Sequence, residues 1–123
     1  MKFCHVTMYV KNLEESLHFY SDIIGLPVKR RFSPAPNMDI VFLGDGETEI
    51  ELIDNQAQAD VSIGSDISLG FEVQSVQETQ EFLRQNGITP GDIQQPSPQV
   101  KFFFVSDPNG VNIQFCENEK GNE

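Results

Sequence analysis

Residues Phe102–Phe115 read FFFVSDPNGVNIQF, and this stretch decides the fold expected for the whole chain. Two short apolar runs flank the segment Asp107-Pro108-Asn109-Gly110. Proline fixes the backbone angle required at the second position of a type I turn, and asparagine and glycine tolerate the conformations that close it. The residues after the turn alternate between apolar and polar, as in a half-buried strand. The stretch therefore predicts an antiparallel β-hairpin.

The same pattern occurs 63 residues earlier in the chain. Ile40–Leu43, the turn Gly44-Asp45-Gly46 and Glu47–Ile53 predict a second hairpin, in which Glu51 holds the place of Gln114. The same offset aligns three further features: the strand patterns at 5–10 and 68–73, the candidate helix caps Asn12 and Ser75, and the prolines Pro27 and Pro90. The chain is therefore one structural module written twice.

Each module is expected to contain a strand, a helix and three further strands. In the first module, His5–Val10 alternates as a strand, and Asn12 with Glu15 three residues later is typical of a helix N-terminus. Gly25 marks the end of that helix, Pro27–Phe32 is the second strand, and residues 33–37 form a loop.

The second module repeats these signals. Its helix begins after Ser75, ends at Gly87, and has four residues expected to face inward: Val76, Thr79, Phe82 and Leu83. Residues 96–98 are predicted to form the loop that corresponds to the first module's loop at 33–37. We expect a single α+β domain of two tandem βαβββ modules, at 1–54 and 67–117, with a connector at 55–66 and a charged tail at 118–123.

The two faces of the predicted sheets differ in character. Aliphatic residues of one parity are expected to pack against the helices. The opposite parity collects polar residues from both modules: His5, Thr7, Tyr9, Glu49, Glu51, Ser68, Gly70, Glu72, Asn112 and Gln114. Half-exposed antiparallel sheets commonly present such a face to water. Because the middle strands are apolar on both parities, a curved, mixed-sheet cup that holds a ligand is the favoured interpretation.

Composition excludes several classes of partner. The 123 residues include 8 Lys and Arg against 19 Asp and Glu, which gives a net charge of −11. Such a surface repels phosphate backbones, so nucleic acid is not an expected partner. The acidity serves solubility or the attraction of a cationic ligand. No apolar run reaches membrane-spanning length, the first residues lack a signal pattern, and the two cysteines stand far apart, which favours the cytoplasm.

The repeated βαβββ pattern resembles the vicinal oxygen chelate superfamily, which includes glyoxalase I, methylmalonyl-CoA epimerase, extradiol dioxygenases, and fosfomycin- and bleomycin-resistance proteins. The likeness covers about residues 2–117. It is carried by the opening strand with His5, the segment HFYSDIIGLPV, the strand Glu-Ile-Glu-Leu and the closing SDPNGVNIQF. In this family each module forms half of a cup, and a divalent metal ion lies between the halves.

The resemblance implies four metal-ligand positions, which fall on His5, Glu51, Ser68 and Gln114. An imidazole and a carboxylate suit nickel, cobalt, zinc or manganese. Ser68 stands where a second histidine is expected, and Gln114 stands where a carboxylate is expected. The amide oxygen of Gln114 can coordinate but carries no charge and is no base. We therefore expect His5, Glu51 and Gln114 as metal ligands, Glu51 as the catalytic base, and a metal that is weakly held or absent.

Four further residues are predicted to contact a small-molecule ligand: Tyr9, Arg30, Arg31 and Phe104. Each candidate has a structural alternative. His5 and Glu51 also fit as hydrogen-bonded or solvated strand residues, and the arginines fit as one exposed strand face.

The expected function is that of a metal-dependent lyase or isomerase, similar to lactoylglutathione lyase, acting on a small thiol adduct or oxygenated metabolite. The alternative is a protein of the bleomycin-resistance type that sequesters a ligand without catalysis, and a third is an accessory domain with a vestigial site. Iron dioxygenase chemistry is disfavoured, because the other histidine, His18, lies in the middle of the first helix. A homodimer is expected, because modules of this size leave sheet edges to be covered.

Overall fold

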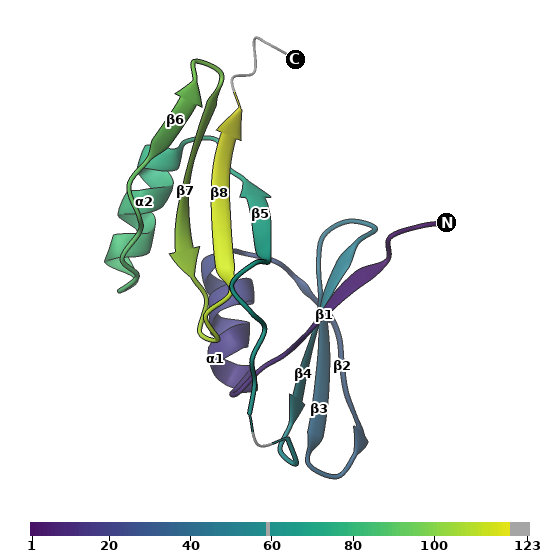
Figure 1. Cartoon of the computed structure of the whole chain (residues 1–123). Helices are drawn as coiled ribbons and strands as arrows, with labels where there is room; N and C mark the ends of the chain where they lie inside the picture. Colours follow the sequence, from purple (N-terminus) through teal and green to yellow (C-terminus); the bar gives the residue numbers. More distant parts are fainter. Residues whose placement is uncertain (59, 119–123) are drawn as a thin grey trace. The chain divides into compact units, whose positions relative to one another are not determined.

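The computed structural model describes residues 1–58 and 60–118. The chain divides into two compact units, the first spanning Met1–Ile63 and the second beginning at Gly64. Each unit contains a four-stranded mixed sheet and one helical segment, as Figure 1 shows. This is the α+β architecture that the repeat predicts. No helix in the described ranges is long and apolar enough to cross a bilayer.

The first unit follows the predicted order of strand, helix and three strands. Its strand order is β1-β4-β3-β2, with β1 parallel to β4 and the other pairs antiparallel. The elements are β1 (His5–Tyr9), α1 (Leu13–Leu17), the π-helical segment η1 (His18–Ile23), β2 (Val28–Ala35), β3 (Met38–Leu43) and β4 (Glu49–Asn55).

The second unit repeats the order. Its strands run β5-β8-β7-β6, again with the outermost pair β5 and β8 parallel. The elements are β5 (Ser68–Glu72), α2 (Val76–Gln85), β6 (Gln94–Ser97), β7 (Val100–Ser106) and β8 (Asn112–Asn118).

The 63-residue repeat holds in the strand register. His5 pairs with Glu49 in β1 and β4, and Ser68 pairs with Asn112 in β5 and β8, and the same offset holds for all five pairs. The pairing of β7 with β8 departs from the 63-residue offset by one residue. In the first unit Phe42 of β3 faces Glu51, whereas in the second unit Phe104 of β7 faces Gln114. The paired residues Phe104 and Gln114 are therefore 10 positions apart along the chain, whereas Phe42 and Glu51 are 9 apart.

The turn at 107–110 closes the second hairpin as predicted. The carboxylate Oδ1 of Asp107 accepts hydrogen bonds from the backbone N–H groups of Asn109 (2.7 Å) and Val111 (2.8 Å), and the carbonyl of Asp107 accepts from Gly110 N–H at 3.1 Å. Gly110 has φ +84°, which a residue with a Cβ rarely adopts. The local sequence therefore fixes the turn through side-chain and backbone bonds alone.

Both predicted helix caps are confirmed. The side chain of Asn12 accepts a hydrogen bond from Glu15 N–H at 3.0 Å, and Ser75 Oγ accepts from Glu78 N–H at 3.1 Å. Each bond satisfies a backbone donor that the helix itself leaves free.

The first helix contains a feature that the sequence pattern does not predict. After α1 the backbone widens into η1, and Ile24 N–H donates to the carbonyl of Phe19, five residues back. Phe19 and Tyr20 are both buried and form an edge-to-face pair, with ring centroids 5.0 Å apart. The spacing of apolar residues three and four positions apart is the same whether or not one turn of the helix holds an extra residue. The sequence pattern therefore predicts an ordinary α-helix here.

Two predicted loops are partly strands. The strand predicted at Pro27–Phe32 is β2 and runs over Val28–Ala35, which takes in part of the loop expected at 33–37. Likewise, Pro96 and Ser97 belong to β6 rather than to a loop. Both β2 and β6 are edge strands, where a proline removes no bond from the sheet interior.

Two smaller boundaries also differ. Phe82 is predicted to face inward but is 44% exposed. The buried residues of α2 are Val76 and Leu83, as predicted, and Gln80, whose Nε2 donates to the carbonyl of Gly91 at 2.8 Å. The strand β8 includes Asn118, which the prediction assigned to the tail. The rest of the predicted tail, 119–123, lies outside the described residues.

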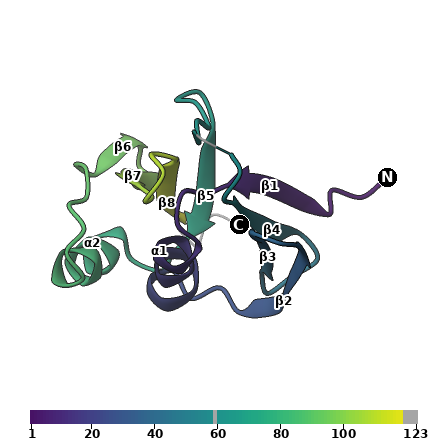
Figure 2. The same cartoon turned by 90° about the horizontal axis from the view of Figure 1, so that it is seen from below.

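Each unit buries the helix-facing side of its sheet. In the first unit α1 packs against β4, and in the second α2 packs against β7 and β8 (Figures 1 and 2). The fully or almost fully buried aliphatic residues of the first sheet are Met8, Val41, Leu43 and Leu52. The helix side thus supplies one apolar core. The opposite side combines polar groups with a smaller buried apolar cluster of Ile40, Phe42 and Ile53.

Candidate functional site

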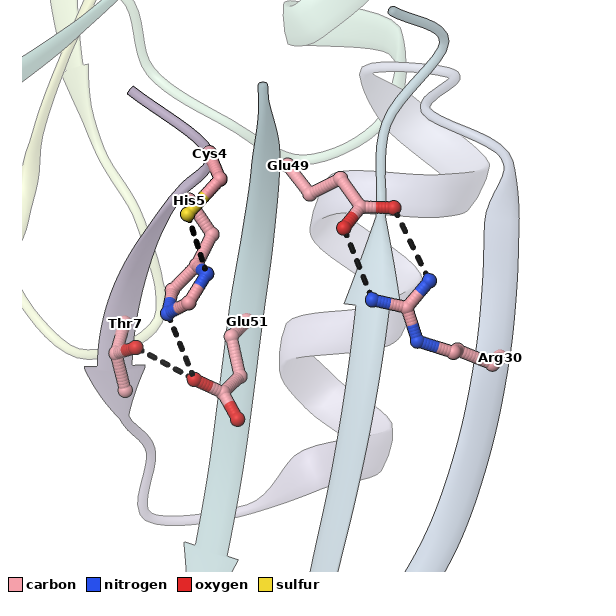
Figure 3. A network of polar contacts seen from close by, with 6 residues as sticks. All are labelled: Cys4, His5, Thr7, Arg30, Glu49 and Glu51. Atoms are coloured by element: carbon pink, nitrogen blue, oxygen red, sulfur yellow. Dashed lines mark hydrogen bonds and ion pairs between the residues drawn. The ribbon is translucent and has the colours of Figure 1, made fainter. Parts of the chain in front are cut away.

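The pair His5 and Glu51 forms the centre of the candidate site in the first unit. Because β1 and β4 are parallel, His5 lies opposite Glu49 and Thr7 lies opposite Glu51, all on the side of the sheet that faces away from the helix. Figure 3 shows the imidazole of His5 turned toward Glu51, with 3.7 Å between Nε2 and Oε1. The Glu51 side chain is 14% exposed and the His5 side chain is 40% exposed. The pair is accessible at the imidazole and sheltered at the carboxylate.

Thr7 completes this arrangement, although the sequence analysis did not place it in the site. Its Oγ1 donates a hydrogen bond of 2.5 Å to Glu51 Oε1, the same oxygen that lies near His5 (Figure 3). A hydrogen bond to a charged group is stronger than one between neutral groups and fixes its orientation. The signal that could have found Thr7 is the parallel register, which sets it directly opposite Glu51.

A thiol contacts the other nitrogen of the same imidazole. Cys4 Sγ lies 3.5 Å from His5 Nδ1 (Figure 3). The described contacts therefore run in sequence from the thiol of Cys4 through the imidazole of His5 and the carboxylate of Glu51 to the hydroxyl of Thr7.

Arg30 lies beside this group and is already paired. Its two terminal nitrogens donate to the two carboxylate oxygens of Glu49 at 3.0 and 3.3 Å, as Figure 3 shows. The guanidinium carbon also lies 4.1 Å from the centre of the Phe42 ring, a cation–π distance. The Phe42 ring is also perpendicular to the His5 ring, at 5.8 Å between centroids, and stacks with Phe32 at 6.3 Å. Arg30 and the aromatic rings thus extend the polar site across the sheet.

The two arginines predicted to contact a ligand lie on different faces. Arg31 NH1 is 3.5 Å from the carboxylate of Glu14 in α1, on the helix side of β2. Successive strand residues point to opposite faces, so Arg31 is not brought to the His5 group with Arg30. Tyr9 is partly exposed and shares the face of His5 on β1.

The remaining candidates belong to the second unit. Ser68 on β5 faces Asn112, and Gln114 on β8 lies between Gly70 of β5 and Phe104 of β7. The Phe104 ring packs edge-to-face against Phe102, at 5.8 Å between centroids. These positions offer a hydroxyl and an amide, with no imidazole or carboxylate at either predicted ligand position. Their approach to His5 and Glu51 stays a prediction.

The donor atoms of the first unit fit one side of a metal site. Two bonds of about 2.1 Å at a tetrahedral angle hold their donor atoms about 3.4 Å apart, and His5 Nε2 and Glu51 Oε1 are 3.7 Å apart. Within the described ranges no three side chains from among His, Cys, Asp and Glu are grouped to hold an ion. In the described part of the chain the His5–Glu51 pair thus supplies two of the four or more donor atoms that a metal site needs.

A two-module α+β fold with an imidazole and a carboxylate on the open face of its first sheet defines the class of protein. The model of the Glyoxalase/Bleomycin resistance protein/Dioxygenase superfamily matches residues 2–115. The chain belongs to this superfamily, which confirms the resemblance drawn from the repeated module.

Within the superfamily the chain is similar to named enzymes over its whole length. It is 32% identical to the lactoylglutathione lyase of Haemophilus influenzae, over 97% of this chain and 94% of that one. It is 28% identical to the lactoylglutathione lyase of Neisseria meningitidis serogroup A, over 100% and 95%. Among solved structures, the trypanothione-dependent glyoxalase I of Leishmania major superposes with a TM-score of 0.81 and 26% identity, over 99% of this chain and 89% of that one.

Proposed function

We propose that this protein is a lyase or isomerase that moves a proton on a small thiol adduct of an aldehyde, or on a similar oxygenated metabolite. The observation that carries the proposal is the convergence of His5 Nε2 and Thr7 Oγ1 on Glu51 Oε1. The similarity to lactoylglutathione lyases supports the reaction class.

The chemistry requires a base beside the carbon that loses its proton. Glu51 is the carboxylate that occupies this role, because the other position implied by the family resemblance is the neutral amide of Gln114. Thr7 orients the carboxylate through its hydrogen bond, and His5 borders it on the exposed side. A single base can remove the proton and return it to the neighbouring carbon, and the hydroxyl proton passes between the two adjacent substrate oxygens, which completes the isomerisation.

A divalent ion would be held by His5 and Glu51, whose donor atoms lie 3.7 Å apart, and the family resemblance implies Gln114 as a further ligand. When bound, such an ion supplies positive charge that stabilises the developing negative charge on substrate oxygens. With one charged ligand in place of two, the attraction for the ion is reduced. We infer that binding is weak and exchangeable, and that nickel, cobalt, zinc and manganese are the candidates.

The second candidate function is non-catalytic ligand sequestration. The observation that favours it is the ring of Phe32, which is 44% exposed and stacks on the buried Phe42 beside the Arg30 guanidinium. Aromatic faces bind planar or cationic ligands without chemistry, and the net charge of −11 favours cations. Neutral residues at Ser68 and Gln114 are also consistent with a lost metal site.

Proton exchange separates the two functions. Hemithioacetals of methylglyoxal with several small thiols are incubated in deuterated water with the protein and each candidate metal, and loss of the carbon-bound proton is followed by NMR. We expect exchange that Glu51→Gln lowers by about a hundredfold or more, the scale of general-base catalysis. The control is Glu49→Gln, whose side chain has 15% exposure against 14% for Glu51.

An exchange rate equal to that of buffer, together with stoichiometric binding of the same compounds by calorimetry, would reject the enzyme and favour sequestration. Equal losses in the two variants would show that Glu51 is not the base.

A further inference from the structure

We infer that Thr7 is a positioning residue that gives the two carboxylate oxygens of Glu51 different roles. Its hydroxyl fixes Oε1 on the side of His5 and thereby leaves Oε2 as the oxygen that faces the substrate. The inference rests on the proposed function and deepens it, because the choice between the two oxygens decides where a substrate must lie. Neither the sequence pattern nor the family resemblance assigns a role to Thr7.

The side-chain contacts of Glu51 are confined to one of its oxygens. Thr7 Oγ1 donates a hydrogen bond of 2.5 Å to Oε1, and His5 Nε2 lies 3.7 Å from the same atom. Among the described residues no side chain forms a hydrogen bond or an ion pair with Oε2, and Figure 3 shows this oxygen turned away from Thr7. The two oxygens are therefore inequivalent, and Oε2 is the one open to a further partner.

A hydroxyl at this position has a specific effect on a glutamate. The terminal torsion of a glutamate side chain is broad and roughly two-fold, so a carboxylate without fixed contacts exchanges its two oxygens freely. The bond from Thr7 removes this freedom. Because the Glu51 side chain is only 14% exposed, the bond is stronger than the same bond in water. The donor is itself well placed, since a β-branched side chain on a strand has restricted χ1 rotation.

The second unit shows that the fold does not need a hydroxyl at this position. The residue 63 positions after Thr7 is Gly70, which pairs with Gln114 in the parallel register of β5 and β8. Thr7 pairs in the same way with Glu51 in β1 and β4. The hydroxyl and the carboxylate thus occur together in one unit and are replaced together in the other. This pattern favours a role in the site over a role in the sheet.

The test compares the wild type with Thr7→Val, Thr7→Ser and Thr48→Val. Valine keeps the branched shape and the strand preference of threonine but has no hydroxyl, and serine restores the donor. Thr48→Val is the matched control, because Thr48 Oγ1 also donates to an oxygen of the first unit, the carbonyl of Phe3 at 2.8 Å. Thermal melting establishes that each variant is folded.

The first measurement is proton exchange, with the hemithioacetal of methylglyoxal and 2-mercaptoethanol as the substrate. In Thr7→Val we expect kcat to fall about tenfold or more, while KM changes by less than about threefold, because a misplaced base slows the reaction more than it weakens binding. Thr7→Ser should recover most of kcat, and Thr48→Val should equal the wild type. A general loss of stability does not produce this separation of kcat from KM.

The second measurement is infrared spectroscopy of the metal-free protein. Each protein is compared with its own Glu51→Gln counterpart, so that the difference spectrum contains the carboxylate bands of Glu51. A carboxylate that is hydrogen-bonded at one oxygen has unequal C–O bonds, which widens the spacing between its asymmetric and symmetric stretches. We expect the wide spacing in the wild type, Thr7→Ser and Thr48→Val, and a narrower spacing in Thr7→Val.

An unchanged kcat in Thr7→Val, no recovery in Thr7→Ser, or equal band spacing in the wild type and Thr7→Val would each overturn the inference. The spectra require neither metal nor turnover, so the two proposals fail separately. Wide spacing that depends on Thr7, in a protein without proton exchange, would reject the proposed function and uphold the positioning of Glu51. Exchange that Thr7→Val leaves unchanged would uphold the function and reject the positioning.

Discussion

The metal affinity of Glu51→Gln tests the candidate site most directly. The substitution keeps the size of the side chain and removes its charge. Two unit charges about 4 Å apart attract by about 4 kcal/mol at an effective dielectric constant of about 20. If the cost of removing the carboxylate and the ion from water offsets half of this attraction, about 2 kcal/mol remains. Losing it raises the Kd for the ion roughly thirtyfold. A divalent ion carries twice the charge, so this value is a lower bound.

The matched control is Glu49→Gln, on the same strand and face. The two glutamates are almost equally exposed, at 14% and 15%, but Glu51 faces His5 and Thr7 whereas Glu49 is bound to Arg30. Calorimetric titration with nickel, cobalt, zinc and manganese should show at least roughly a thirtyfold loss in Glu51→Gln and less than about a threefold change in Glu49→Gln. Equal losses would mean that general negative charge attracts the ion, and a larger loss in Glu49→Gln would place the site elsewhere.

Three further predictions concern stability and assembly. Replacing either helix cap, as in Asn12→Ala or Ser75→Ala, should lower the free energy of unfolding by about 1 kcal/mol. Urea denaturation measures this change. The controls are Glu15→Gln and Glu78→Gln, which keep the backbone N–H donors of the two caps. Because the folded pKa of Cys116 is raised, its contribution to stability is present below the unfolded thiol pKa and is lost as pH rises through the folded value. Wild type should therefore lose more stability than Cys116→Ser above about pH 8.5, and equal pH profiles would contradict the shift. Because every residue of the edge strand β2 is exposed, including Val28 and Phe32, we expect a homodimer; sedimentation as a monomer at micromolar concentration would reject it.

The sequence alone determined the modular fold because its signals are local. The turn at 107–110, the caps Asn12 and Ser75 and the alternating strands each depend on residues a few positions apart, and their recurrence at a fixed offset of 63 identifies the repeat. The sequence also predicts that His5 and Glu51 lie on the polar face of the sheet. Alternation along a single strand is enough to assign a side chain to a face, whatever the neighbouring strand is.

Edge strands and the inserted helical residue required the tertiary structure. The prolines in β2 and β6 indicate loops in sequence, but an edge strand needs only one partner and tolerates them. Phe19 and Tyr20 are buried in the wider turn of η1. Their packing depends on the folded structure, and the periodicity of the sequence does not indicate it.

The detailed site also depended on a pairing that sequence parity does not specify. Alternation assigns Thr7 and Glu51 to a face, but only the parallel register of β1 and β4 sets one opposite the other and brings His5 within 3.7 Å of the carboxylate. The order β2-β3-β4 likewise brings Arg30 within reach of Glu49, which it binds across β3. Thr7 and Glu51 are 44 positions apart along the chain and Arg30 and Glu49 are 19 apart, so these contacts are set by the folded sheet.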